Sequence, residues 1–124
     1  MSDDNVRMVE RLIEGLNAKN VGVMDEVFTE DAVMEWPQSG ERIRGAKVRR
    51  AVYARIDPLP TITPRRITTA PDLVIAEAHL DYDGTGFECI FVFEMRGGRI
   101  AKETAYWATP FEPPAWRAAL VERM

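Results

Sequence analysis

Residues 72–108, DLVIAEAHLDYDGTGFECIFVFEMRGGRIAKETAYWA, decide the fold. Apolar and polar residues alternate along most of this stretch, and a period of two is the pattern of a half-buried β-strand. The turn sequences DYDGTG and RGG divide the stretch into hairpins. The pattern therefore predicts a run of antiparallel strands at 65–70, 73–82, 86–95 and 99–108.

The N-terminal part of the chain has the helical period instead. Apolar residues recur three or four positions apart, which predicts helices at 4–19, around Met24 and at 45–56. A strand is expected at 29–36, an extended connector at 58–64 and a short terminal helix within 111–122. This order predicts a single α+β domain over residues 1–124, with three N-terminal helices packed on one face of a curved, mixed or antiparallel sheet. We expect a small-molecule cavity between the helices and the concave face of the sheet.

Composition and charge exclude several classes of function. The 124 residues carry a formal net charge of −4, which argues against a nucleic-acid partner, and the arginines between Arg42 and Arg66 are expected on a solvated helix face. With one cysteine and one histidine, the sequence predicts no metal site, and without a glycine-rich phosphate loop we expect no cofactor. The hydrophilic start MSDDNVR and the lack of a long apolar run predict a cytoplasmic protein that does not bind membranes.

The orientation of Glu103 depends on the register of the last hairpin. A three-residue turn with a glycine bulge would pair Met95 with Arg99 and Phe91 with Glu103, so that Glu103 points into the cavity with Trp107. A two-residue turn on Gly97 and Gly98 would shift the register by one residue and turn Glu103 outward. We favour the three-residue turn, because it pairs the apolar residue sets and leaves Lys102 outside.

Two stretches, FTEDAVMEWPQSGERIRGA and GGRIAKETAYWATPF, resemble the nuclear transport factor 2-like superfamily. The resemblance covers roughly residues 5 to 110 and is closest to its SnoaL-like polyketide cyclase and ketosteroid isomerase branch. It implies a conical α+β barrel with a deep pocket and a homodimeric assembly. Tyr53 and Trp107 match pocket residues of the isomerases, and Glu103 falls at a pocket position that is more often apolar in the family.

The catalytic residues of the well-known members are missing from their matching positions. For the ketosteroid isomerases these positions hold Trp36, Leu12 and Phe91, and for the limonene epoxide hydrolases they hold Ala105, Ala78 and Leu80. The resemblance therefore implies a fold and a pocket, but it does not carry a known mechanism to this chain.

The sequence thus predicts a protein that binds a small, apolar, ring-bearing molecule. If it is an enzyme, we expect cofactor-free acid–base chemistry (isomerisation, cyclisation, hydration or dehydration), with Glu103 moving the proton and Tyr53 polarising a carbonyl. The alternative is a binding or accessory protein without catalysis. The remaining predicted ligand-binding residues are Trp36, Phe91, Trp107, Met34, Cys89 and Ala105.

Overall fold

The computed structural model describes residues 2–124 and contains three α-helices, six strands and one 3-10 turn. The helices are α1 (Ser2–Asn17), α2 (Val23–Val27) and α3 (Ala46–Tyr53). The strands are β1 (Phe28–Trp36), β2 (Glu41–Arg44), β3 (Thr61–Ala70), β4 (Leu73–Tyr82), β5 (Thr85–Arg96) and β6 (Arg99–Ala108). The 3-10 turn η1 is Ala115–Arg117.

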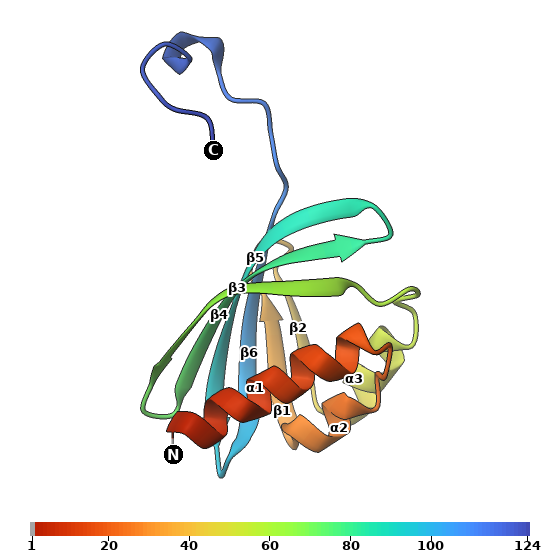
Figure 1. Cartoon of the computed structure of the whole chain (residues 1–124). Helices are drawn as coiled ribbons and strands as arrows, with labels where there is room; N and C mark the ends of the chain where they lie inside the picture. Colours follow the sequence, from red (N-terminus) through yellow and green to blue (C-terminus); the bar gives the residue numbers. More distant parts are fainter. Residues whose placement is uncertain (1) are drawn as a thin grey trace.

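The strands form one curved sheet in the order β2-β1-β6-β5-β4-β3, with the helices on its concave face (Figure 1). β1 runs parallel to β6, and every other pairing is antiparallel, so the sheet is mixed. The expected barrel is not closed within residues 2–124, because β2 and β3 remain edge strands. Pro64 is tolerated in β3 because an edge strand leaves one row of N–H groups unpaired.

The core lies between the apolar stripe of α1 and the inward side chains of the sheet. The stripe consists of Val9, Leu12, Ile13 and Leu16, which are all buried. On β4 the buried residues alternate from Val74 to Leu80, as the period of two predicts. At Gly15 an added Cβ would lie 2.5 Å from Val23, so only glycine lets α1 approach α2 this closely.

The structure departs from the predicted elements at three places. Residues 41–44 form the short strand β2, which the sequence did not indicate because three of its four residues are charged. β3 begins at Thr61, within the expected connector. The predicted C-terminal helix is reduced to the single turn η1, which has no buried residue. A helix this short needs packing against its apolar face, and the tail extends away from the domain (Figure 1).

Candidate active site

A β-bulge in the last hairpin turns Glu103 into the core. The turn itself is the two-residue form, with Arg96 opposite Arg99 and positive φ angles of 60° and 79° at Gly97 and Gly98. The predicted pairings of Met95 with Arg99 and of Phe91 with Glu103 are therefore wrong: Met95 pairs with Ile100, and Phe91 pairs with Ala105.

Beyond the Met95–Ile100 pair, moving away from the turn, the register shifts by one residue. Ala101 and Lys102 of β6 both stand opposite Glu94 of β5. This extra residue reverses the effect of the shorter turn on side-chain direction. Glu103 then pairs with Phe93 and is 4% exposed. The inward orientation of Glu103 is confirmed, but its cause is the bulge and not the turn.

Glu103 lines a narrow cavity between α1 and the sheet. The free volume of the cavity is about 50 Å³, far below the roughly 300–1,000 Å³ of sites for drug-sized ligands. The other lining side chains are apolar apart from the hydroxyl groups of Tyr53 and Tyr82 and the indole N–H of Trp107. The lining residues are Leu12, Ile13, Leu16, Met24, Tyr53, Ile56, Leu59, Pro60, Ile62, Ala76, Ala78, Leu80, Tyr82, Phe91, Phe93, Glu103 and Trp107.

Burial dominates the electrostatics of Glu103. Loss of hydration raises its pKa from 4.5 to about 7, and the positive charge of Arg49 opposes this rise. The structure shows no hydrogen bond to the Glu103 carboxylate from any of residues 2–124. A carboxyl group in this state exchanges its proton near neutral pH, which is the property required of a general acid or base.

Tyr53 and Tyr82 share the cavity with Glu103. Burial raises the pKa of Tyr53 well above 10, and the negative charge of Glu103 raises it further. For Tyr82 burial is again the main cause of a raised pKa, while hydrogen bonding from Trp107 lowers it. Both phenols are therefore neutral hydrogen-bond donors at physiological pH. Tyr82 was not among the predicted site residues, although its place at the end of the inward alternation of β4 was a usable signal.

An open depression lies outside the cavity and shares two side chains with it. Tyr82, Thr85, Phe87 and Trp107 line this depression, which has a volume of about 430 Å³. Tyr82 and Trp107 also line the inner cavity, so they form the boundary between the two compartments. The Tyr82 and Phe87 rings meet edge to face at 5.7 Å, which makes the depression aromatic.

Of the six predicted ligand-binding residues, two line the cavity and four do not. Phe91 and Trp107 line the cavity, and their rings meet edge to face at 6.4 Å. Trp36 is outside the lining and packs behind Trp107, with ring centroids 5.3 Å apart. Met34, Cys89 and Ala105 lie in the packed core and not on the cavity wall.

Cys89 and His79 take no part in the cavity. Burial raises the pKa of the Cys89 thiol to about 12, which leaves it unreactive near neutral pH. His79 lies on the outer face of the sheet, where its Nδ1 is 2.6 Å from the Glu88 carboxylate. Within residues 2–124, no three potential metal ligands gather, and no helix is long and apolar enough to cross a membrane.

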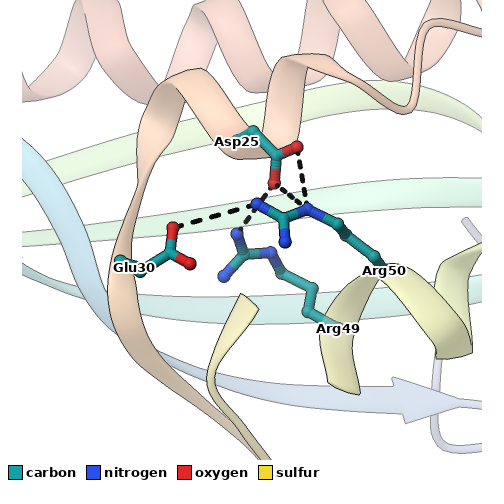
Figure 2. A network of polar contacts seen from close by, with 4 residues as sticks. All are labelled: Asp25, Glu30, Arg49 and Arg50. Carbon is teal, nitrogen blue, oxygen red and sulfur yellow. Dashed lines mark hydrogen bonds and ion pairs between the residues drawn. The ribbon is translucent and has the colours of Figure 1, made fainter. Parts of the chain in front are cut away.

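The predicted solvated helix face of arginines is only partly correct: Arg42 and Arg44 lie on β2 and Arg65 and Arg66 on β3, all of them exposed. Arg49, on α3, is buried. Its side chain is 2% exposed, and its Nη2 lies 3.2 Å from Asp25, which also accepts hydrogen bonds from Arg50 (Figure 2). The Arg49 guanidinium lies 5.1 Å from the centre of the Phe28 ring. Its Nε and Nη1 have no hydrogen-bond partner among the described residues. α3 thus places a buried positive charge close enough to Glu103 to lower its pKa.

Comparison with known proteins agrees with this architecture. A search among curated proteins found no match. An NTF-2 like protein of unknown function from Burkholderia xenovorans is 28% identical, with a TM-score of 0.87 over 98% of this chain and 96% of that one. A proposed ketosteroid isomerase from Kribbella flavida is 21% identical, with a TM-score of 0.89 over 99% and 91%.

An LEH-like epoxide hydrolase from M. tuberculosis is 23% identical, with a TM-score of 0.74 over 86% of this chain and 84% of that one. These more distant structures share the fold. The family model of the SnoaL-like domain matches residues 9–103, from the second half of α1 to the first half of β6. The chain therefore belongs to the SnoaL-like domain family.

Proposed function

We propose that this protein is a cofactor-independent acid–base catalyst that moves a proton within a small carbonyl compound. The observation that carries the proposal is Glu103, a carboxyl group that is 4% exposed, lies in an apolar cavity and has no hydrogen-bond partner among residues 2–124. Leaving such a group unpaired costs stability, and groups of this kind are concentrated at functional sites.

In the proposed reaction the Glu103 carboxylate removes a proton from the carbon next to the carbonyl. The C–H bond breaks, its electron pair forms the enolate, and the proton resides on Glu103. The Tyr53 hydroxyl donates a hydrogen bond to the enolate oxygen and remains protonated, which its raised pKa favours. Glu103 then delivers a proton to a conjugated carbon, which gives isomerisation, or, after its own proton has exchanged with solvent water, to the same carbon, which gives isotope exchange.

The two compartments define the class of substrate. A cavity of about 50 Å³ admits only a slim group, whereas the outer depression of about 430 Å³ can hold a ring against Tyr82, Phe87 and Trp107. We infer a substrate whose planar ring rests in the outer depression while a short carbonyl-bearing arm, or the edge of the ring, reaches Glu103.

Deuterium incorporation tests the proposal. A panel of small cyclic ketones, conjugated enones and lactones is incubated with the protein in D₂O, and exchange at carbon is followed by NMR. We expect exchange above background for at least one compound, with its loss in Glu103→Gln and retention in Glu10→Gln, which changes an exposed carboxylate on α1. Exchange that survives Glu103→Gln would refute the role of Glu103.

A second candidate is a ligand-binding protein without catalysis. It is favoured by Trp36, Leu12 and Phe91, which stand where the resemblance to ketosteroid isomerases places catalytic groups. Under this alternative, ring compounds bind equally well to the wild type and to Glu103→Gln, as measured by Trp107 fluorescence, and no compound in the panel exchanges deuterium.

A further inference from the structure

A side chain from the turn between β1 and β2 holds the backbone of Trp107. The Gln38 Nε2 donates a hydrogen bond of 2.9 Å to the Trp107 carbonyl oxygen, and the Trp107 N–H donates one of 2.6 Å to Gln38 Oε1. A glutamine amide carries a donor and an acceptor side by side, so it can satisfy both backbone groups of one residue, as a neighbouring strand would. We call this pair of hydrogen bonds the Gln38 clamp.

The Gln38 clamp lies where the sheet itself gives little support to β6. The pairing of β1 with β6 ends at Glu35 opposite Thr104, before Trp107 is reached. β6 ends one residue after Trp107, and residues 109–124 leave the sheet and extend away from the domain (Figure 1). Because the ends of strands open more readily than their centres, the clamp is what holds this end of β6 on the β1 side.

The position of Trp107 decides how the two compartments communicate. Trp107 and Tyr82 form the boundary between the inner cavity and the outer depression, and the Trp107 indole hydrogen bonds to Tyr82. The Trp107 ring also meets the ring of Trp36, which directly precedes the turn that carries Gln38. This turn region therefore fixes both the backbone and the ring of Trp107. A displacement of Trp107 would widen the boundary without moving Glu103.

Gln38 supports the boundary from outside the site. Its side chain is exposed and lies outside the lining of both compartments. Among the described residues, its side chain hydrogen bonds with Trp107 alone. Water can replace the amide at an exposed position, so removal of the side chain should leave the fold intact. The effect expected from its loss is therefore a less fixed Trp107.

We propose that Gln38 is a positioning residue that sets the width of the ligand admitted to Glu103. By holding Trp107, the Gln38 clamp keeps the boundary closed to all but slim groups, such as the unsubstituted edge of a planar ring. A ring with substituents beside that edge stays in the outer depression. The inference rests on the proposed function for the kind of ligand, but the clamp does not depend on chemistry at Glu103. Supporting contacts of this kind determine how precisely a site is built.

Fluorine NMR of protein labelled with fluorotryptophan tests whether the clamp fixes Trp107. The chain has three tryptophans, so three resonances are expected, and replacing one tryptophan at a time assigns them. Gln38→Leu removes both hydrogen-bonding groups, and should broaden the Trp107 resonance and increase its shift between H₂O and D₂O. Gln38→Glu keeps an acceptor for the Trp107 N–H and should have a smaller effect.

The matched control is Ser39→Ala, which removes a hydroxyl group of the same turn that bonds only to the Trp36 carbonyl. Its Trp107 resonance should equal that of the wild type. A Trp107 resonance that is the same in Gln38→Leu and in the wild type would overturn the proposal, because Trp107 would then be fixed without the clamp.

Ligand width gives the second test. The dissociation constants of cyclohexenone and of isophorone, the same ring enone with three added methyl groups, are measured from the Trp107 resonance. We expect the wild type to prefer cyclohexenone and Gln38→Leu to reduce this preference by about fivefold or more, through tighter binding of isophorone. A wild type that binds neither enone or shows no preference, or a preference unchanged by Gln38→Leu, would refute the role in specificity.

The same titrations in Glu103→Gln separate this inference from the proposed reaction. We expect that variant to keep the wild-type preference, because the Gln38 clamp is intact in it. If no compound exchanges deuterium, the proposed proton transfer fails, but the resonance of Trp107 and the preference between the two enones still decide the role of Gln38.

Discussion

Glu103→Gln should change how the stability of the protein depends on pH. The pKa of Glu103 is about 7 in the folded protein and 4.5 when the residue is hydrated, as in the unfolded chain. Between these two values the folded state holds a proton that the unfolded state has lost. The stabilisation from this proton is complete below pH 4.5 and is lost as the pH rises through about 7.

The magnitude follows from the width of this window. Each pH unit corresponds to about 1.4 kcal/mol, so the wild type should lose about 3 kcal/mol across it. Glutamine has nearly the same shape and does not titrate. The difference in unfolding free energy between Glu103→Gln and the wild type should therefore grow by about 3 kcal/mol in favour of the variant from pH 4.5 to pH 7.5. The carboxylates with lowered pKa values, such as Asp25 and Glu88, titrate in both proteins and cancel.

The assay is urea denaturation at fixed protein concentration and at half-unit pH steps, followed by tryptophan fluorescence. Trp107 lines the cavity with Glu103 and should report the same transition in the folded state. Glu10→Gln is the matched control and should show a constant difference from the wild type, because Glu10 is exposed on α1. A difference for Glu103→Gln that stays constant over pH 4.5–7.5, or that grows in the opposite direction, would show that Glu103 is hydrated in the folded protein and that its pKa is not raised.

Three further predictions follow from the same geometry. Arg49→Met removes the positive charge that lowers the pKa of Glu103, so the midpoint of the Trp107 fluorescence titration should move above the wild-type value; an unchanged midpoint would disconnect the two groups. Ala76→Val enlarges a side chain on the wall of the 50 Å³ cavity. We expect it to lower the free energy of unfolding by less than the roughly 1–3 kcal/mol of ordinary overpacking, and to reduce deuterium exchange. Gly15→Ala places a Cβ 2.5 Å from Val23 and should lower the free energy of unfolding by about 1–3 kcal/mol, as measured by urea denaturation. An unfolding free energy equal to that of the wild type would contradict this close contact.

The sequence predicted the strands with long alternating patterns better than the short or solvated elements. β4 and β6 begin and end at the predicted residues, because alternation over ten residues leaves little freedom in choosing the buried face. β2 was missed because only Ile43 of its residues is buried, and one apolar residue makes no pattern. The C-terminal helix was predicted from composition, but composition does not show whether a surface exists on which the helix can pack.

The candidate site was predictable in residue types but not in volume or pairing. Period two placed Glu103, Phe91 and Trp107 on one face, and the structure brings all three to one cavity. No sequence pattern indicated that the cavity would be as small as 50 Å³, since free volume depends on how side chains from seven helices and strands fill the same space. Arg49 was misplaced for a related reason: its neighbours on α3 are solvated, and only the packing of α3 beside Asp25 and Phe28 buries it.

In a regular hairpin the length of the turn also fixes the direction in which Glu103 points. The bulge at Ala101–Lys102 makes this direction independent of the turn. The turn needs glycines with positive φ at 97 and 98, and this two-residue form by itself would send Glu103 to solvent. A register correction four residues later restores the inward orientation, at the cost of a local break in the ladder. A leucine at position 103 would fill this place with a better-packed core and without a charge to desolvate. The bulge instead directs a carboxyl group into an apolar cavity, where burial of a charge is unfavourable. A buried arginine lowers the pKa of this carboxyl group. This combination supports a chemical role for Glu103 more strongly than its burial alone would.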